Sequence, residues 1–183
     1  METKTRRAQR PKPNYAFIDS QNLNLGVRAQ GWRLDWTKFK SYLQSQWKVS
    51  KAFLFIGYIE EQEEMYTQLR KMGYTLVFKP TVVHGEEVKG NVDVELVLHM
   101  MTEWNNYNQA IIISGDGDFY SLVKHLIEKQ KLAALVVPNR RRFSSLYAEV
   151  PEKHLAYMDS LRSALSYRPS RPAKPNASSS QKD

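Results

Sequence analysis

Short apolar runs alternate with amphipathic stretches along most of the chain. Five of these runs are rich in β-branched and aromatic residues, have the length of strands, and are bounded by Gly, Pro, Asp or Lys. The predicted strands are Tyr15–Ile18, Lys51–Ile59, Tyr74–Phe78, Ala110–Ser114 and Leu132–Val137. The second run is apolar on both faces, which is typical of a strand that is covered on both sides of a parallel sheet.

Helical periodicity fills the stretches between the predicted strands. Asp35 is a suitable N-cap for a helix that runs to about Trp47. The acidic run after the second strand suits the start of another helix, and Gly73 is a suitable end for it. We expect further helices over Val92–Trp104, from Phe119 onward and between Phe143 and Tyr167, and a turn or small hairpin over Thr81–Gly90.

This alternation predicts a single α/β domain over residues 14–167. Its simplest form is a three-layer α/β/α sandwich around a mainly parallel, five-stranded sheet. Residues 1–13 and 168–183 are basic, polar and rich in Pro or Ser, so we expect disordered tails there. No apolar run has the length of a membrane helix and the first residues do not form an apolar signal, which favours a cytoplasmic protein without a membrane partner.

Charge and cysteine content narrow the classes of function. The chain has no cysteine, which excludes disulfides and thiolate chemistry. Its formal net charge is +8, and most of this charge lies in the two tails, which hold nine basic residues against two acids. Basic tails suit a nucleic-acid partner because they attract phosphate without reading sequence. Solubilising ends are the alternative interpretation.

Four aspartates are expected at one edge of the sheet. Asp19 follows the first predicted strand, Asp116 and Asp118 follow the fourth, and Asp93 begins the helix between the third and fourth strands. The carboxyl ends of parallel strands share an edge, where open α/β sheets bind ligands. Carboxylates that are gathered there repel one another unless a cation neutralises them, and oxygen ligands suit Mg²⁺ or Mn²⁺.

Each of these acids also has a purely structural interpretation. Asp19 could be a turn residue, and Asp93 and Asp118 could cap helices. Asp116 with the glycine after it is a common turn pair. The expected convergence of all four favours a metal site.

Basic and aromatic residues supply a second set of candidates. Arg140, Arg141 and Arg142 directly follow the fifth strand, and with Lys129 and Lys131 they are candidates to hold phosphates beside the acids. The polar stretch 20–24 is expected to be a functional loop. Single aromatics at Tyr107, Tyr120 and Phe143 are candidates for base stacking, although such residues more often belong to the core.

Three motifs together resemble the NYN domain family, and more closely its LabA-like branch within the PIN-like nuclease superfamily. They are Asp-Ser-Gln-Asn at 19–22, Lys-Gly-Asn-Val-Asp-Val at 89–94 and Ser-Gly-Asp-Gly-Asp-Phe at 114–119. The resemblance covers residues 14–165, nearly the whole predicted domain. It implies a PIN-like sheet with strand order 3-2-1-4-5 and a ribonuclease site that depends on Mg²⁺ or Mn²⁺.

The resemblance also implies roles for individual residues. Asp19, Asp93, Asp116 and Asp118 would form the acidic cluster, and Asn22 would orient the first acid or touch the scissile phosphate. Lys89 matches a lysine of the family and is a candidate for RNA binding. The sequence departs from many relatives at His99, where they have an aspartate. This residue is six positions from Asp93, so on a helix the two do not share a face.

The leading hypothesis is a metal-dependent endoribonuclease whose partner is RNA. The alternative is an RNA-binding or regulatory module that keeps the fold and the acids without cleaving RNA. A phosphatase on a related fold is a third interpretation, weakened because no second acid stands two residues after Asp19. The oligomeric state is left open, a homodimer included.

Overall fold

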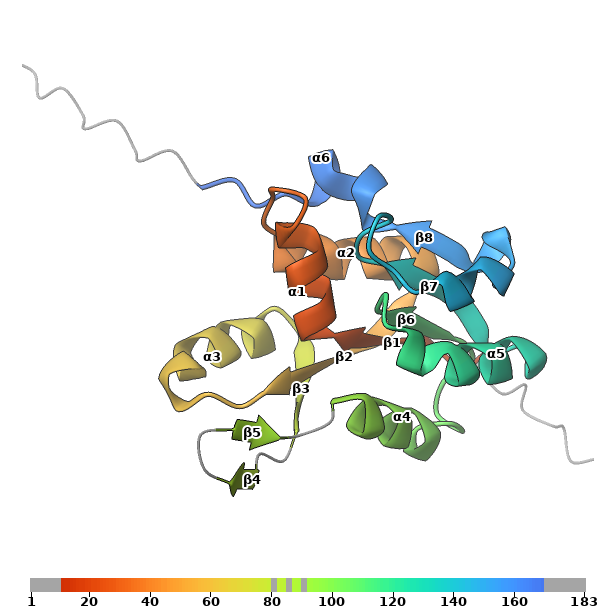
Figure 1. The fold of residues 1–183 in the computed structure, drawn as a ribbon, viewed down its shortest axis with the longest axis horizontal. Coiled ribbons are helices and arrows are strands. Elements are labelled where there is room, and N and C mark those ends of the chain that lie inside the picture. Colours follow the sequence, from red (N-terminus) through yellow and green to blue (C-terminus); the bar gives the residue numbers. More distant parts are fainter. Residues whose placement is uncertain (1–10, 80–81, 85–86, 90–91, 170–183) are drawn as a thin grey trace, which may run out of the picture.

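A fully parallel, six-stranded sheet forms the middle of the molecule (Figure 1). The computed structural model describes residues 11–79, 82–84, 87–89 and 92–169, so the predicted tails lie almost wholly outside the described residues. The strand order is β3-β2-β1-β6-β7-β8. These strands are β1 (Asn14–Asp19), β2 (Val49–Gly57), β3 (Tyr74–Lys79), β6 (Ala110–Ile113), β7 (Leu132–Val137) and β8 (Leu155–Tyr157).

The prediction of a parallel sheet between helices is confirmed, and its five strands have the expected order. The sixth strand, β8, was not expected, because residues 143–167 were predicted to be helical. This segment contains short turns of helix around β8, which pairs with β7 from Leu135 to Val137. A three-residue strand is too short to show a period in the sequence, and the free edge of β7 decides its pairing. The short helical turns are η3 (Ser145–Glu149), η4 (Glu152–His154), η5 (Met158–Leu161) and α6 (Arg162–Leu165).

The remaining helices connect the strands. Asp35 caps α2 as predicted, and its carboxylate accepts from the backbone N–H of Lys38. The stretch predicted as a polar loop after β1 is instead the first turn of α1, because Asp19 caps a helix there. The helices and 3₁₀ turns are α1 (Ser20–Arg28), α2 (Trp36–Trp47), η1 (Glu60–Gln62), α3 (Glu63–Lys71), α4 (Val92–Thr102), η2 (Gly117–Phe119) and α5 (Tyr120–Glu128).

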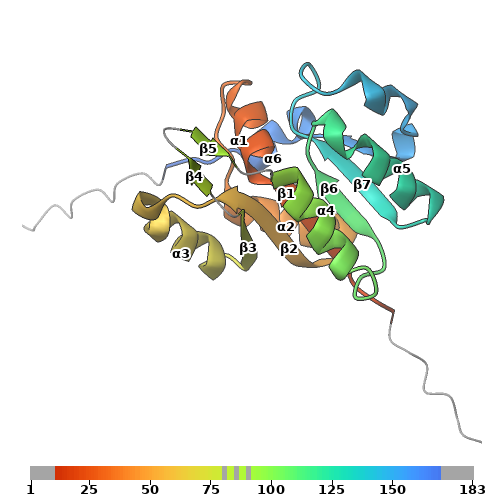
Figure 2. The same cartoon turned by 60° about the horizontal axis from the view of Figure 1, so that its bottom comes forward.

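Helices lie on both faces of the sheet (Figure 2), and a hydrophobic core lies on each face. Alternate residues of β1 serve the two cores: Ala16 and Ile18 face one, and Tyr15 and Phe17 face the other. Side chains of α1, α2, α3 and α6 complete the first core, and side chains of α4 and α5 complete the second. The central strands β1, β6 and β7 are therefore buried on both faces, which explains why their sequences are apolar throughout.

The predicted small hairpin is also present. It consists of β4 (Val82–His84) and β5 (Glu87–Lys89), which pair in antiparallel register apart from the main sheet. None of the helices in the described part of the chain has the length and apolar character needed to cross a membrane.

The neighbours β1 and β6 mark the point where the sheet changes direction of winding. From β1 the chain proceeds outward to β2 and β3, and after returning through α4 it proceeds from β6 outward to β7 and β8. Open α/β sheets bind ligands outside the carboxyl ends of the strands at such a switch point. Asp19 ends β1 at this place, and the segment 114–119 follows β6.

Candidate metal centre

Three carboxylates meet at the switch point. Asp93, Asp116 and Asp118 each offer one carboxylate oxygen, and these oxygens lie within 4.8 Å of one another. Asp93 comes from the first turn of α4, while Asp116 and Asp118 flank the start of η2. Asp93 and Asp116 are partly buried and Asp118 is exposed, so the group opens to solvent on one side. The structure thus brings together three of the four predicted acids.

Asp19 lies beside this group and is held differently. It is only 6% exposed, and its Oδ1 accepts from the backbone N–H of Asn22 at 3.0 Å as the N-cap of α1. Its Oδ2 accepts from the Ser114 hydroxyl at 3.4 Å. Asp19 is outside the set whose oxygens lie within 4.8 Å, but its charge acts on both Asp93 and Asp116. It is therefore an inner member of the acidic cluster.

Asn22 and Ser114 join the two strand ends that carry the acids. The Asn22 side-chain Oδ1 accepts from the backbone N–H of Gly115 at 2.8 Å. The Ser114 hydroxyl oxygen accepts from the backbone N–H of Asp116 at 3.1 Å while its proton is directed to Asp19. These bonds fix the start of the 114–119 segment against α1. Asn22 was predicted to orient Asp19 or to touch the scissile phosphate; its backbone N–H donates to Asp19, while its side chain binds Gly115. Its contact with phosphate stays a prediction.

The 114–119 segment turns sharply because a glycine permits close approach at its centre. A Cβ added at Gly117 would lie 2.4 Å from the Ser144 hydroxyl oxygen and 2.9 Å from the Ser144 Cβ. Asp116 caps η2 by accepting from the backbone N–H of Asp118 at 3.1 Å. The Tyr147 hydroxyl donates to the backbone carbonyl of Asp116 from the far side. Asp118 does not cap α5, whose N-cap position is occupied by Phe119. Asp116 therefore serves both as the N-cap of η2 and as a member of the acidic cluster.

The cluster is electrostatically unfavourable without a cation. Burial raises the pKa of Asp19, and the nearby Asp116 charge adds to this effect. Burial also raises the pKa of Asp93, and so do the charges of the three other aspartates. The Lys79 charge, at the carboxyl end of β3, partly offsets the shift of the Asp93 pKa. The folded chain therefore holds carboxylates where their ionised forms are disfavoured.

These donors fit a small divalent cation. The group contains only carboxylate oxygens, and its exposed side leaves room for water and substrate oxygens, as Mg²⁺ and Mn²⁺ require. The described part of the site contains no imidazole or thiolate, the ligands that zinc sites generally use. A divalent cation would also remove the mutual repulsion that raises the pKa of Asp93.

The loop after β7 brings the three predicted arginines to the same edge. The backbone N–H of Ser144 donates to the carbonyl of Gly115 at 3.0 Å, which joins this loop to the acidic segment. The backbone N–H of Arg140 donates to Asp159, and its guanidinium lies over the Tyr157 ring at 4.8 Å from the centroid. All three arginines are exposed. The backbone at the end of this loop therefore lies against the acidic segment, and contact of the three arginines with phosphate stays a prediction.

Two predicted phosphate contacts are wrong. Lys129 and Lys131 precede β7, so they lie at the amino edge of the sheet, opposite the acids. The Lys131 ammonium donates to the carbonyls of Trp104 and Tyr107 and packs over both rings. Tyr107 is also wrong as a stacking candidate, because it is fully buried in the core. The two lysines precede β7 and the three arginines follow it, so β7 places them at opposite edges of the sheet. Grouping them by their charge alone did not take this into account.

The other aromatic candidates have partners within the protein. The Tyr120 hydroxyl donates to Glu149, and the Phe143 ring packs against Tyr157 with centroids 6.1 Å apart. Both rings are partly exposed. Their role in base stacking stays a prediction.

His99 lies away from the acids, as its spacing from Asp93 predicted. Its ring packs against Phe53 at 4.4 Å and Phe55 at 5.7 Å between centroids, and burial lowers its pKa. Lys89 lies in β5, where it pairs with Val82. Its contact with RNA stays a prediction.

Three further residues belong to the site although the sequence did not single them out. Ser114 has a signal in the sequence, since it stands at a strand end directly before the acids. Lys79 has a weaker signal as the last residue of a strand. Tyr147 has none, because its place under Asp116 depends on the turn that returns from β7.

Comparisons with known proteins agree with this architecture. Residues 15–154 match the family model of the NYN domain. The low amplitude and bright protein LabA of Synechococcus elongatus is 27% identical over 134 residues, which are 67% of this chain and 72% of LabA. A crystal structure of a protein of unknown function from Vibrio parahaemolyticus has a TM-score of 0.64 at 23% identity, over 87% of this chain and 97% of that one. At this identity the structural likeness shows the fold alone.

Proposed function

Because the chain belongs to the NYN domain family, among the PIN-like nucleases, we propose that it is an endoribonuclease that depends on Mg²⁺ or Mn²⁺. The observation that carries this proposal is the meeting of Asp93, Asp116 and Asp118 within 4.8 Å at the switch point of the sheet. Acids from two separate segments converge there although their charges repel one another. Such an arrangement is useful chiefly for holding a cation.

Each acid has a distinct role in this proposal. Asp93, Asp116 and Asp118 hold the cation, with Asp116 kept in place by its bond to the N–H of Asp118. Asp19 adds negative charge from its buried position, and Asn22 positions the acidic segment through Gly115. A cation held by these aspartates would neutralise the scissile phosphate and lower the pKa of a bound water molecule.

The arginine loop provides the complementary part of the site. Arg140, Arg141 and Arg142 are exposed at the edge that carries the acids. Guanidinium groups bind phosphate oxygens through two parallel hydrogen bonds, so they suit the RNA backbone on either side of the cleaved bond. The loop would hold the substrate while the acids hold the cation.

The first test is the substitution Asp116→Asn, measured as cleavage of total RNA in Mn²⁺. The asparagine Oδ1 can still accept from the N–H of Asp118, so the turn should keep its shape. We expect cleavage to fall by at least about a hundredfold, because a neutral ligand holds the cation far less well. Chelation by EDTA should have the same effect on the wild-type protein.

A matched control is Glu128→Gln, which removes an exposed carboxylate at the far end of α5. It should cleave RNA like the wild type. Wild-type cleavage by Asp116→Asn would overturn the assignment. Binding of RNA without cleavage by the wild-type protein, in either metal, would point instead to the RNA-binding or regulatory module.

A further inference from the structure

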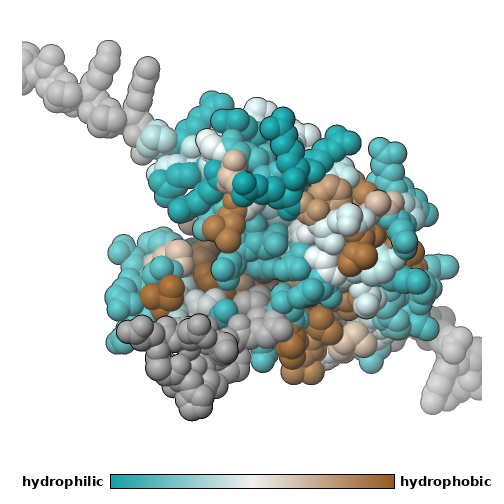
Figure 3. Space-filling view, in the orientation of Figure 1, coloured by the Kyte–Doolittle hydropathy of each residue, from teal (hydrophilic) through white to brown (hydrophobic). Residues whose placement is uncertain are grey.

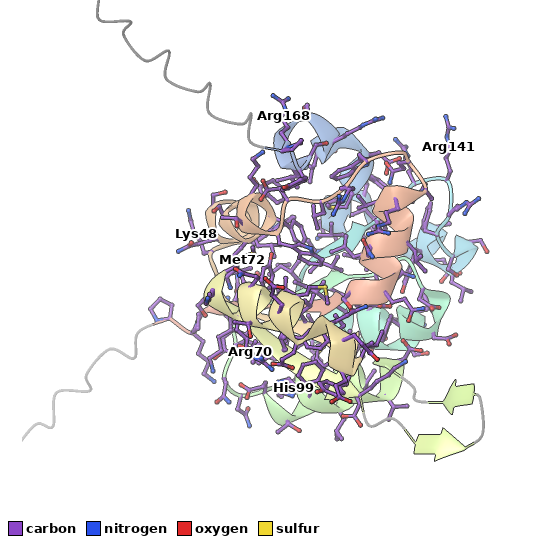
Figure 4. The ribbon with its side chains drawn as sticks, turned by 90° about the vertical axis from the view of Figure 1, so that its left-hand side faces the viewer. Lys48, Arg70, Met72, His99, Arg141 and Arg168 are labelled. Carbon is purple, nitrogen blue, oxygen red and sulfur yellow. The ribbon has the colours of Figure 1, made fainter. Side chains whose placement is uncertain are left out.

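Arginines from three distant segments come together at the end of α1 that is remote from the acids. Arg70 on α3 lies away from this region and pairs with Glu63. Figure 4 shows Arg141 and Arg168 at one end of the molecule and Arg70 apart from them. Figure 3 shows hydrophilic side chains over the same end, around α1 and α6.

The route from the acids to these arginines follows α1. Asp19 caps the first turn of α1, and Arg28 lies in its last turn. Nine residues of helix span about 14 Å. Arg28 is therefore separated from the acidic cluster by the length of a few nucleotides, and it is exposed.

The arginine loop, residues 138–144 after β7, is hydrogen-bonded to α1. The Gln30 side chain donates to the carbonyl of Pro138 at 2.6 Å, and the Asn139 side chain donates to the carbonyl of Gly26 at 3.3 Å. Arg140 is the next residue, and from there the loop runs back from the end of α1 to Ser144, whose backbone N–H donates to Gly115 in the acidic segment. The end of α1 and the arginine loop are thus neighbouring parts of one surface.

The C-terminal segment adds an exposed ring beside a third arginine. The backbone N–H of Tyr167 donates to the carbonyl of Arg33 at 2.8 Å, and the Arg33 guanidinium lies 5.5 Å from the Tyr167 ring centroid. Tyr167 is 50% exposed, and the exposed Arg168 follows it. An exposed ring next to guanidinium groups is an arrangement on which an unpaired base can stack.

A surface hollow lies between these groups. It has a volume of about 420 Å³ and is lined by Arg28, Gly31, Trp32 and Arg33. The indole N–H of Trp32 is buried and has no acceptor among the described residues. The charged groups that line the hollow are the guanidinium groups of Arg28 and Arg33, which suit an anionic ligand.

We propose that single-stranded RNA extends from the acidic cluster along this arginine track, defined as Arg28, Arg33 and Arg168 with the ring of Tyr167. The track binds the RNA backbone several nucleotides away from the cleaved bond. It favours long, unpaired substrates over short ones because a short substrate reaches only the acids and the arginine loop. This inference takes its substrate class from the proposed endoribonuclease function.

The test is binding of a labelled single-stranded RNA of about twelve nucleotides, followed by fluorescence anisotropy in EDTA at several salt concentrations. We expect Arg28→Ala/Arg33→Ala to weaken binding about tenfold and to reduce the slope of log K against log salt by about 1.4, since each lost contact to single-stranded phosphate removes about 0.7. Tyr167→Ala should weaken binding without changing the slope, because it removes stacking alone.

The matched control is Arg70→Ala/Lys71→Ala, which removes two exposed charges from α3. It should bind like the wild type. Equal binding by the control and by Arg28→Ala/Arg33→Ala would overturn the track, and an equal loss for a duplex would overturn its preference for unpaired RNA. If the double variant does not fold, the single variants Arg28→Ala and Arg33→Ala replace it in the same measurement. Each should reduce the slope of log K against log salt by about 0.7.

Cleavage of a dinucleotide in Mn²⁺ separates this inference from the proposed function. Arg28→Ala/Arg33→Ala should cleave it at the wild-type rate, because the track lies beyond its reach. If the wild type binds RNA along the track but cleaves nothing, the nuclease assignment fails and the track stands. If cleavage occurs and the double variant binds long RNA normally, the track fails and the nuclease assignment stands.

Discussion

At the scale of single residues, the site is built on aspartates that serve two purposes. Asp19 is both the N-cap of α1 and an inner member of the acidic cluster, and Asp116 is both the N-cap of η2 and a candidate ligand. The capping bonds hold the side chains in place before any cation arrives. The charges that suit them to a cation also make the cation-free protein less stable.

The raised pKa of Asp19 leads to a prediction about pH. A raised pKa means that the folded protein binds more protons than the unfolded chain between the ordinary and the raised value. The contribution of Asp19 to stability is therefore fully present below its ordinary pKa of about 3.9, and it is lost as pH rises through the raised pKa. We expect Asp19→Asn to be more stable than the wild type at neutral pH without metal, with a difference that shrinks toward about pH 4.

Urea unfolding of metal-free protein at several pH values measures this difference. Asn can still accept from the N–H of Asn22, so the cap is kept. The control is Asp35→Asn. In the wild type Asp35 caps α2 as Asp19 caps α1, but the Asp35 carboxylate pairs with the Lys38 ammonium at 3.4 Å. It should gain no stability. A neutral-pH gain that is equal for both variants, or absent for Asp19→Asn, would contradict this account.

At the scale of elements, the site depends on how α1 packs against the end of β7. Gly26 lies within α1, and a Cβ added there would be 2.6 Å from the Cβ of Pro138. The same contact carries the hydrogen bonds from Gln30 and Asn139 that place the arginine loop. A small residue at this position lets the helix approach the strand end closely enough to form them.

Gly26→Ala therefore sets two effects against each other. Alanine should stabilise an isolated helix by about 1 kcal/mol relative to glycine. Overpacking against a proline ring typically costs about 1–3 kcal/mol, and it wins here because the proline cannot move to another rotamer. We expect Gly26→Ala to lower the free energy of unfolding in urea.

The comparison variant is Asn24→Ala, at an exposed position of the same helix. It gains helix propensity without a clash, so it should be neutral or slightly stabilising. If Gly26→Ala is as stable as Asn24→Ala, the close packing of α1 on Pro138 is not what holds these elements together.

At the scale of the whole molecule, a cation would join parts that the backbone leaves separate. Asp93 belongs to α4 on one face of the sheet, whereas Asp116 and Asp118 continue from β6 in its centre. A ligand that binds only the folded state raises stability in proportion to the logarithm of its concentration. The cluster therefore predicts a stability that depends on divalent metal.

We expect Mn²⁺ at roughly a hundred times its Kd to stabilise the wild-type protein by about 2.7 kcal/mol, seen as a rise of several degrees in Tm. Asp116→Asn should lose most of this rise, while Glu128→Gln should keep it. Differential scanning calorimetry with Mn²⁺, Mg²⁺ and EDTA measures all three proteins. An equal rise for wild type and Asp116→Asn would show that the metal binds elsewhere.

The sequence by itself determined the fold class, and its resemblance to the NYN domain family implied the order of five strands and the acids of the site. Continuous apolar runs and helical periodicity are local properties, so Ala110–Ile113 and Leu132–Val137 were recognisable as buried strands. The placement of acids directly after such strands then led to the expectation of one cluster. Most helices were placed to within a few residues for the same local reason.

Only the tertiary structure decided which residues meet. Lys129 and Lys131 are close in sequence to the arginine loop, yet strand β7 lies between them and that loop. Because β7 runs from the amino edge of the sheet to its carboxyl edge, the lysines and the arginines are on opposite edges. Tyr147 reaches Asp116 across thirty-one positions of sequence. β8 exists because β7 offers an unpaired edge, and Arg33 in the loop after α1 meets Tyr167 because the C-terminal segment returns past it. Contacts of this kind depend on the path of the whole chain, and no local pattern of residues records them.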